Sequence, residues 1–192
     1  MNMEFGPVGQ SALSASSRVP CPDDRFQSAL DRLNGPLPRL AAIAERNLGH
    51  LPSLRSALVE LSNKQDLPAL RRGVLGEINT AIRLEKLGRA VHEISADVRG
   101  PDGRKFTDVD VLTRGGSAIE VRDHATTITR SGIAAKADRM CALRDQGLSV
   151  DGVQVRWLFL FAPGGVTPNA RQYLEDRGIT VLTSIRDLSK VT

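Results

Sequence analysis

One hairpin pattern near the middle of the chain most restricts its fold. Phe106–Thr113 and Ser117–Arg122 alternate apolar and polar side chains, and a short loop with two glycines separates them. Alternation with a period of two predicts half-buried β-strands, and the loop predicts an antiparallel hairpin. Burial of Val109, Val111 and Ile119 on one face fixes the register, because a shift of one residue would turn every side chain to the opposite face. The predicted register pairs Val111 with Ile119.

Four charged residues occupy the other face of this predicted hairpin. The register places Asp110 opposite Glu120 and Asp108 opposite Arg122, with directly opposed Cβ atoms about 4.5–5.5 Å apart. Two carboxylates at that distance repel each other unless they share a proton, bind a cation or are solvated. Because Mg²⁺ prefers carboxylate oxygens and water, we expect Asp110 and Glu120 to hold a divalent metal rather than to lie on a solvated face. For Asp108 we expect an ion pair with Arg122 rather than metal ligation.

The remaining elements surround this hairpin in an order that defines the fold class. From Leu67 the pattern predicts the order α-β-β-β-α-β-α-β, which indicates an α/β protein with a mixed sheet flanked by helices. The nearly continuous apolar run at 153–161 predicts a strand covered on both sides, with Trp157, Phe159 and Phe161 in the core. The other predicted helices and strands span residues 67–88, 129–146 and 168–177 (helices) and 91–98 and 179–183 (strands).

The N-terminal third of the chain differs from the rest. Residues 1–22 are rich in Ser, Gly and Pro and are expected to form a flexible lead-in. Residues 23–66 predict a small helical segment, and residues 67–192 predict the main domain. The first 66 residues carry as many basic as acidic residues, so the net charge of +4 lies entirely in the main domain. A polyanionic partner is therefore permitted.

Composition excludes several other classes of protein. With 41% hydrophobic and 25% charged residues, the chain is typical of a globular protein and unlike disordered, collagenous or coiled-coil chains. No apolar run approaches the roughly 18 residues that a membrane helix needs, so no membrane association is expected. Cys21 and Cys141 lie far apart and form no cluster typical of zinc sites, so free thiols are expected. Without an N-terminal signal pattern, the cytoplasm is the expected site of action.

Three further residues are candidates for the same site. Glu77 interrupts an apolar helical stripe that includes Val74 and Ile78, and a glutamate there is rarely buried without a partner. It is expected at the rim of the metal site, with an arginine pair or full solvation as the alternatives. His124 could contact phosphate or aid proton transfer, although a lone loop histidine is usually structural or exposed. Lys136, on the next predicted helix, faces either the site or solvent.

The element order and these acidic residues resemble the PD-(D/E)XK nuclease superfamily, which has the restriction-endonuclease-like fold. The resemblance covers about residues 67–183 and rests on Asp110, followed after a hairpin by Glu120 and, two positions later, Arg122. It implies that Asp110 and Glu120 hold one or two divalent metal ions. It also implies that Glu77 is the additional carboxylate of the first helix.

Arg122 departs from the motif, which has lysine at this position. The lysine is credited with orienting or deprotonating the attacking water and with stabilising charge. Arginine is not deprotonated in proteins, so the general-base role is lost, but a guanidinium can still stabilise negative charge on phosphate. Relatives often place a basic residue on the helix that carries Lys136, which could supply further positive charge.

These features together predict a divalent-metal-dependent endonuclease that hydrolyses phosphodiester bonds in DNA or in RNA such as tRNA. Mg²⁺ or Mn²⁺ would be held by Asp110, Glu120 and Glu77, and Arg122 would stabilise developing charge. A compact basic domain behind a helical segment also resembles the toxin domains of polymorphic and contact-dependent inhibition systems. That resemblance implies a cognate immunity protein and delivery as part of a larger exported protein, with a repair or restriction role as the rival. A homodimer is compatible with the sequence, and Arg122 leaves open a degenerate module that only binds nucleic acid or protein.

Overall fold

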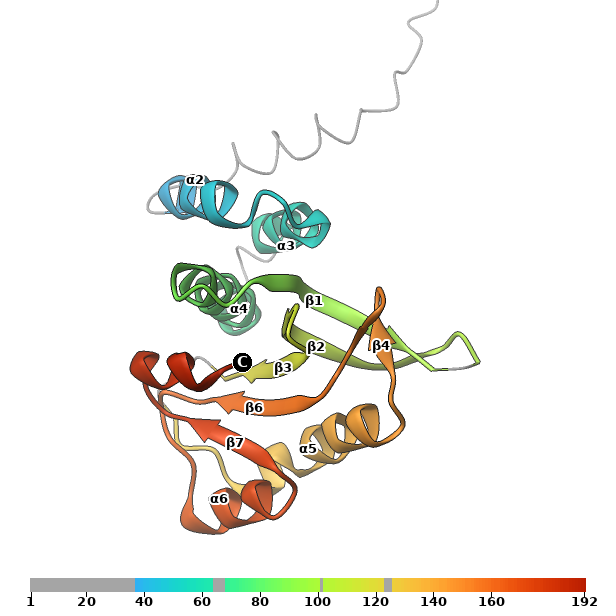
Figure 1. The fold of residues 1–192 in the computed structure, drawn as a ribbon. Helices are drawn as coiled ribbons and strands as arrows, with labels where there is room; N and C mark the ends of the chain where they lie inside the picture. The colour runs from blue at the N-terminus through green and yellow to red at the C-terminus, as the bar shows by residue number, and fades with distance from the viewer. Residues whose placement is uncertain (1–36, 64–67, 101, 123–125) are drawn as a thin grey trace, which may run out of the picture.

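A five-stranded mixed sheet forms the centre of the molecule (Figure 1). The computed structural model describes residues 37–63, 68–100, 102–122 and 126–192. The strands of the sheet are β1 (Val91–Arg99), β2 (Lys105–Thr113), β3 (Ser117–Val121), β6 (Trp157–Phe161) and β7 (Ile179–Leu182). Their order is β1-β2-β3-β6-β7, with antiparallel pairing from β1 to β3 and parallel pairing from β3 to β7. The predicted α/β class and mixed sheet are confirmed.

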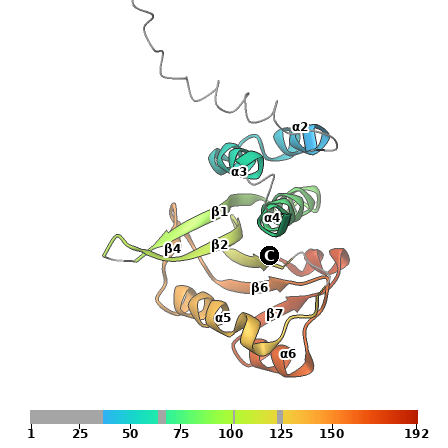
Figure 2. The ribbon, with the colours of Figure 1, turned by 180° about the vertical axis from the view of Figure 1, so that it is seen from behind.

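Helices cover both faces of this sheet (Figures 1 and 2). One face packs against α4, on which α2 and α3 lie, and the other face packs against α5 and α6. None of the described helices is long and apolar enough to span a membrane. The helices are α2 (Leu37–Leu48), α3 (Pro52–Asn63), α4 (Pro68–Lys86), α5 (Arg130–Asp145), α6 (Pro168–Glu175) and the 3₁₀ helix η1 (Ile185–Lys190).

The predicted single strand at 153–161 is two strands. β5 (Val153–Gln154) pairs with β4 (Ser149–Val150) in a separate ribbon, because Asp151 and a following glycine adopt positive φ and reverse the chain. β6 then starts at Trp157, which is 55% exposed, so the prediction that Trp157 belongs to the core is wrong. Phe159 and Phe161, further along β6, are buried as predicted.

The described part of the predicted helical segment shares a core with the main domain. Leu54 and Leu58 of α3 belong to the same buried cluster as Ile78 of α4 and Ile119 of β3. Ser53 also bonds β1 directly through its hydroxyl. Helix α3 is therefore packed against the sheet, and it contributes to the shape of the site described below.

Truncation of a core leucine in α3 tests this packing. Leu58 is fully buried, so Leu58→Ala is expected to lower the free energy of unfolding of the whole protein by about 2–5 kcal/mol. Urea unfolding followed by circular dichroism measures this change. Ile43→Ala in α2, where the side chain is exposed, is the matched control and should have a much smaller effect. An unchanged midpoint for Leu58→Ala would show that α3 does not support the sheet.

Candidate functional site

The β2–β3 hairpin forms in the predicted register at its closed end. Val111 pairs with Ile119, as the sequence predicts. The regular ladder ends there, and Asp110 connects the two strands through its side chain instead. Its Oδ2 accepts a hydrogen bond from the backbone N–H of Val121 at 2.7 Å. The Asp110 carboxylate is thus fixed beside the residue that follows Glu120.

The prediction that Val109 and Val111 are buried on the same face of the hairpin is wrong. Val111 belongs to the cluster beneath α4, whereas Val109 belongs to the cluster beneath α5. On β1, Ser95 lies between the partners of these two valines and has a φ of 51°, which non-glycine residues adopt rarely. The regular alternation of the strands is interrupted at this point. Asp110, opposite Ser95, is consequently only 9% exposed.

A small acidic pocket of about 160 Å³ lies over Asp110. Helices α3 and α4 and strands β1 and β2 all contribute side chains to it. The lining residues are Glu60, Glu77, Ser95, Asp97, Lys105, Asp108 and Asp110. The fold therefore brings Glu77 and Asp110 together as predicted, and it adds carboxylates from α3 and β1.

Burial and neighbouring negative charge raise the pKa values of two carboxylates in the acidic pocket. Burial first, and then the charges of Glu120 and Glu77, raise the pKa of Asp110 to about 8. Burial also raises the pKa of Glu77 to about 7, against the opposing effect of a hydrogen bond from the Ser95 hydroxyl to Glu77 Oε2. Glu60 adds to the increase at Glu77. Burial and mutual repulsion therefore oppose ionisation of both groups, and a cation bound in the pocket would favour it.

Glu120 has the opposite environment, because two cations hold it. It is 3% exposed, with Oε1 2.8 Å from Arg122 Nη2 and Oε2 2.9 Å from Lys136 Nζ. Lys136 comes from α5, is 7% exposed and faces the site rather than solvent. Burial opposes its charge, but Glu120 and Asp110 outweigh burial and raise the pKa of Lys136. The negative charge of Glu120 is thus neutralised by an arginine and a lysine, and Glu120 does not line the acidic pocket.

The predicted ion pair between Asp108 and Arg122 is wrong. Asp108 instead accepts hydrogen bonds from Lys136 Nζ, at 2.9 Å to Oδ1 and 3.0 Å to its backbone carbonyl oxygen. The Arg122 backbone N–H donates to the carbonyl oxygen of Phe161 at 2.8 Å. The chain therefore follows β6 beyond β3, and Arg122 is not opposite Asp108.

Sequence reasoning missed part of the site. Glu60, Ser95 and Asp97 line the pocket, yet their local patterns are those of an ordinary helix and an ordinary strand. The packing of α3 against α4 and β1 brings Glu60 near Glu77, and no local signal predicts this packing. The predicted site residue His124 lies outside the described residues.

The oxygen-rich donor set suits a hard divalent cation. Mg²⁺ is usually held by one or two carboxylates, with waters and substrate phosphates completing its shell. Among the described residues, no three His, Cys, Asp or Glu side chains converge closely enough to form a complete metal-binding group. Asp110 and Glu77, whose ionisation a bound cation would favour, fit an incomplete site of this kind, with Glu120 as the adjacent third carboxylate.

Comparison of the chain with models of known protein families, with curated proteins and with solved structures finds no match. Any proposal of function therefore rests on the fold and the acidic pocket alone.

The acidic pocket predicts how stability depends on pH in metal-free buffer. Between pH about 4 and about 8, the unfolded chain ionises Asp110 and Glu77, whereas the folded protein keeps them protonated up to their raised pKa values. The folded state then binds more protons, so its stability falls as pH rises through this range. Asp110→Asn is expected to flatten the profile and to raise the Tm at alkaline pH by several degrees, measured by thermal melting.

Asp108 supplies a control, because its effect on stability changes with pH in the opposite direction. Partial burial opposes its charge, but Lys136 outweighs burial and lowers the pKa of Asp108. Its ionised form stabilises the fold above the ordinary aspartate pKa, and this contribution is lost as pH falls. Asp108→Asn should therefore lower stability near neutral pH. Parallel pH profiles for Asp110→Asn and the wild type would contradict the environment described for Asp110.

Proposed function

We propose that this chain is a divalent-metal-dependent endonuclease that hydrolyses phosphodiester bonds in nucleic acid. The observation that carries the proposal is the acidic pocket, in which Asp110 and Glu77 are brought together near Glu120 and burial and neighbouring carboxylates raise their pKa values. The α-β-β-β-α-β order around the hairpin supports it, because a nuclease of the PD-(D/E)XK type presents its acidic residues on such a hairpin and on the first helix. The proposed cofactor is Mg²⁺ or Mn²⁺.

Each residue of the site has a separate part in the proposed mechanism. Asp110 and Glu77 would hold the metal, with Glu120 as the third carboxylate, and the bound metal would supply Lewis acidity toward phosphate and water. The Ser95 hydroxyl donates a hydrogen bond to Glu77 Oε2, and this bond orients the Glu77 carboxylate in the pocket. Arg122 is 37% exposed and is the cation beside Glu120 that can approach a phosphate.

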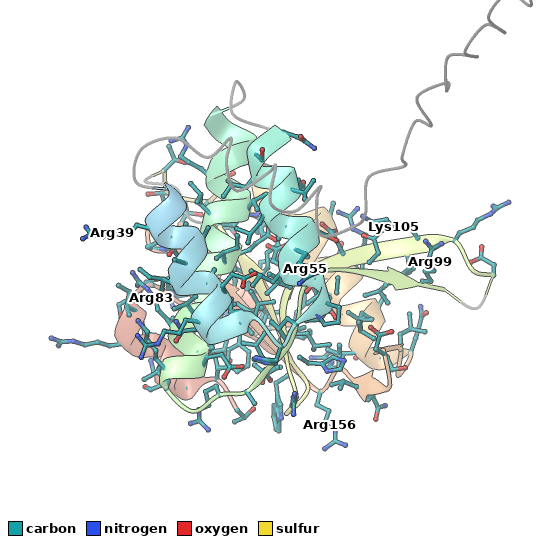
Figure 3. The ribbon with its side chains drawn as sticks, turned by 90° about the horizontal axis from the view of Figure 1, so that it is seen from above. Arg39, Arg55, Arg83, Arg99, Lys105 and Arg156 are labelled. Carbon is teal, nitrogen blue, oxygen red and sulfur yellow. The ribbon has the colours of Figure 1, made fainter. Side chains whose placement is uncertain are left out.

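Basic side chains beside the pocket support a polyanionic substrate. Lys105 lines the acidic pocket itself, and Figure 3 shows Lys105 and Arg99 along the β1–β2 hairpin, which projects from the body of the protein. A phosphate backbone approaching the pocket would meet these cations first. Lys105 is paired with Asp97 at 2.5 Å, so substrate would have to compete for it.

We propose the cytoplasm as the site of action and nucleic acid as the partner, either DNA or RNA such as tRNA. A toxin domain with a cognate immunity protein is the proposed biological setting, and delivery within a larger exported protein belongs to that setting. A homodimer remains part of the proposal. Growth arrest on expression, relieved by the product of a neighbouring gene, would distinguish a toxin from a repair or restriction enzyme.

A cleavage assay tests the activity itself. The purified protein is incubated with DNA, RNA and tRNA substrates, with Mg²⁺ or Mn²⁺ and with EDTA. Cleavage of at least one substrate is expected with metal, and none with EDTA. Cleavage that persists in EDTA would refute the metal-dependent mechanism.

One observation favours a second candidate function. Both oxygens of Glu120 are engaged by cations, and Arg122 replaces the lysine of the motif. A catalytically degenerate module that binds nucleic acid or protein would tolerate both features. Salt-sensitive binding of nucleic acid without cleavage in the same assay would favour this second function.

A further inference from the structure

Trp157, the first residue of β6, lies on the surface at one end of the sheet. It is 55% exposed and is the only aromatic residue among the exposed large hydrophobic side chains of the described part of the chain. A tryptophan ring presents a large apolar face, which is why tryptophan is enriched where proteins bind partners. A single exposed apolar side chain is common on protein surfaces, so the residues around Trp157 decide whether it marks a site.

Two arginines flank Trp157 at the turn between β2 and β3. Arg156 directly precedes Trp157, and the carbonyl oxygen of Gly116 accepts hydrogen bonds from the backbone N–H groups of both, at 2.8 Å and 3.1 Å. Gly116 has a φ of 84°, and a Cβ there would lie 3.3 Å from Cγ of Arg156, so the stem of this arginine lies against the turn. Arg114 belongs to the same turn. We call Arg114, Arg156 and Trp157 the Trp157 patch.

Both guanidinium groups of the Trp157 patch are free to bind an anion. Arg114 and Arg156 are exposed, and neither forms an ion pair or a side-chain hydrogen bond with any of the described residues. In Figure 3 the side chain of Arg156 points away from the body of the protein. The main-chain oxygen of Thr192, which lies beside this turn, is bonded by the hydroxyls of Thr113 and Ser117 rather than by either arginine. The patch thus presents two unpaired positive charges beside one aromatic face.

The Trp157 patch is separate from the acidic pocket. Trp157 pairs with Ser117 at the start of β3, whereas Phe161 pairs with Val121, whose N–H donates to Asp110. The four strand residues between these two pairs span about 13 Å along the sheet, at about 3.3 Å per residue. A ligand at the patch therefore lies at the other end of β3 from the carboxylates proposed to hold the metal.

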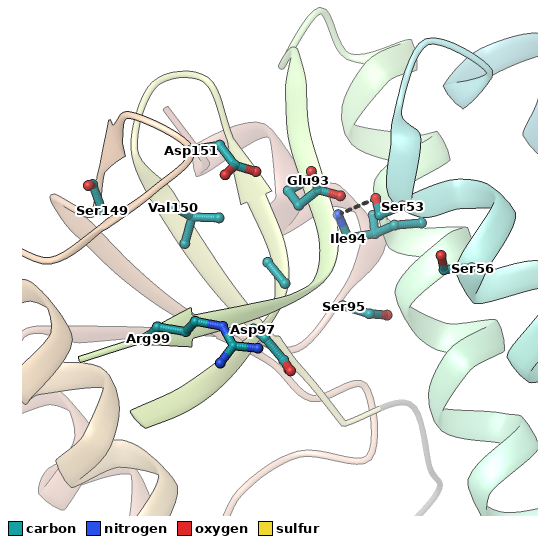
Figure 4. Close-up of a pocket in the computed structure, with 11 residues that line it drawn as sticks. Ser53, Ser56, Glu93, Ile94, Ser95, Asp97, Arg99, Ser149, Val150 and Asp151 are labelled. Atoms are coloured by element: carbon teal, nitrogen blue, oxygen red, sulfur yellow. Dashed lines mark hydrogen bonds between the residues drawn. The ribbon is translucent and has the colours of Figure 1, made fainter. Parts of the chain in front are cut away.

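A pocket of about 450 Å³ beside β1 has the opposite charge (Figure 4). Three carboxylates line it together with a single guanidinium, that of Arg99; the carboxylates belong to Glu93, Asp97 and Asp151. Phosphates would meet excess negative charge there, whereas the Trp157 patch contains only cationic and aromatic side chains. A polyanion is therefore expected at the patch rather than in this pocket.

We propose that the Trp157 patch binds single-stranded nucleic acid, with one base stacked on the Trp157 ring and the adjoining phosphates held by Arg114 and Arg156. Proteins bind single strands without sequence preference by stacking bases on aromatic side chains beside a positively charged surface. A duplex is disfavoured, because its bases are already stacked on one another. A protein partner is disfavoured too, because the centre of a protein interface is largely apolar, and Trp157 is the only apolar side chain of the patch. The inference goes beyond the proposed nuclease activity and does not rest on it.

Tryptophan fluorescence tests the proposal directly, because Trp157 is the only tryptophan of the chain. The full chain is titrated with short oligo(dT) and oligo(U) strands in EDTA, where no cleavage is expected. Both strands are expected to quench the fluorescence, since a stacked base contacts the indole itself. Trp157→Ala is expected to weaken binding of a dye-labelled strand, measured by anisotropy, by about 5- to 150-fold, the range for loss of one stacked base. Trp157→Phe keeps an aromatic face and should recover most of that loss.

The salt dependence of binding tests the two arginines. Arg114→Gln and Arg156→Gln should each reduce the slope of log K against log salt by about 0.7, the value for one phosphate contact on a single strand. Arg139→Gln, at an exposed arginine of α5 that is likewise unpaired among the described residues, is the matched control and should change neither affinity nor slope.

Two results would overturn the proposal. Equal quenching by inorganic polyphosphate or by an oligoglutamate peptide would show that the patch recognises any polyanion, an acidic protein included, rather than a base. Oligonucleotide binding without quenching, or no binding at all, would remove nucleic acid from Trp157. Neither result bears on metal-dependent cleavage at the acidic pocket, which the cleavage assay tests separately.

Discussion

Asp110→Asn is expected to reduce metal-dependent cleavage by about 100-fold or more, because a metal ligand of this kind supplies several kcal/mol of charge stabilisation. The asparagine side chain keeps an oxygen that can accept the Val121 N–H, so the link between β2 and β3 should persist. The same variant removes a carboxylate whose pKa burial raises to about 8. Activity should therefore fall while stability in metal-free buffer rises. Cleavage rates and melting curves of one protein preparation measure both changes.

The opposite signs of these two effects make the result specific. A variant that loses activity through misfolding would lose stability as well. Asp145→Asn, on the exposed surface of α5, serves as the control and should change neither quantity appreciably. Full cleavage by Asp110→Asn would remove Asp110 from the proposed mechanism, whichever substrate is used.

The sequence predicted the hairpin because one short segment contains all the information that defines it. Alternation and the glycine loop set the pairing of Val111 with Ile119, and burial of those side chains on one face excludes other registers. The prediction of one strand over 153–161 was wrong because the local pattern there lacks such information. A continuous apolar run does not indicate where the chain turns, and the positive φ of Asp151 starts a separate ribbon.

The sequence predicted the site residues on the hairpin, but not those that tertiary packing brings to it. Asp110 and Glu120 follow from the hairpin, and the resemblance to a nuclease family added Glu77 on a neighbouring helix. Simple alternation also predicted that Asp108 would meet Arg122, but the regular ladder stops before that pair forms. The contribution of Glu60 depends on the packing of α3 against α4 and β1, which no spacing in the sequence encodes.

The site divides its carboxylates into two electrostatic groups. Glu120 lies between Arg122 and Lys136, whereas Asp110 and Glu77 line the pocket and have raised pKa values. Because Glu120 is already paired with two cations, an added cation would bind at Asp110 and Glu77. This division assigns Lys136 a positioning role, because it holds Glu120 and Asp108 without lining the pocket.

Lys136→Met is expected to lower the free energy of unfolding by an amount toward the lower end of about 3–5 kcal/mol, the range for removing one partner of a buried ion pair. The lower end applies because Arg122 still neutralises part of the charge of Glu120. Urea unfolding near neutral pH measures the loss. Lys86→Met, at the exposed end of α4, should change the free energy of unfolding by no more than about 0.5 kcal/mol.

The pH profile separates positioning from simple packing. Lys136 lowers the pKa of Asp108, so in the wild type this pair stabilises the fold above the ordinary aspartate pKa and loses that contribution on acidification. Lys136→Met removes that contribution, and the difference in stability between the variant and the wild type should therefore shrink as pH falls. Lys136→Arg keeps the charge and should recover most of the loss. Methionine replaces the aliphatic stem of Lys136 but not its ammonium group. A difference in stability that stays constant with pH would therefore show that Lys136 does not act through its charge pair with Asp108.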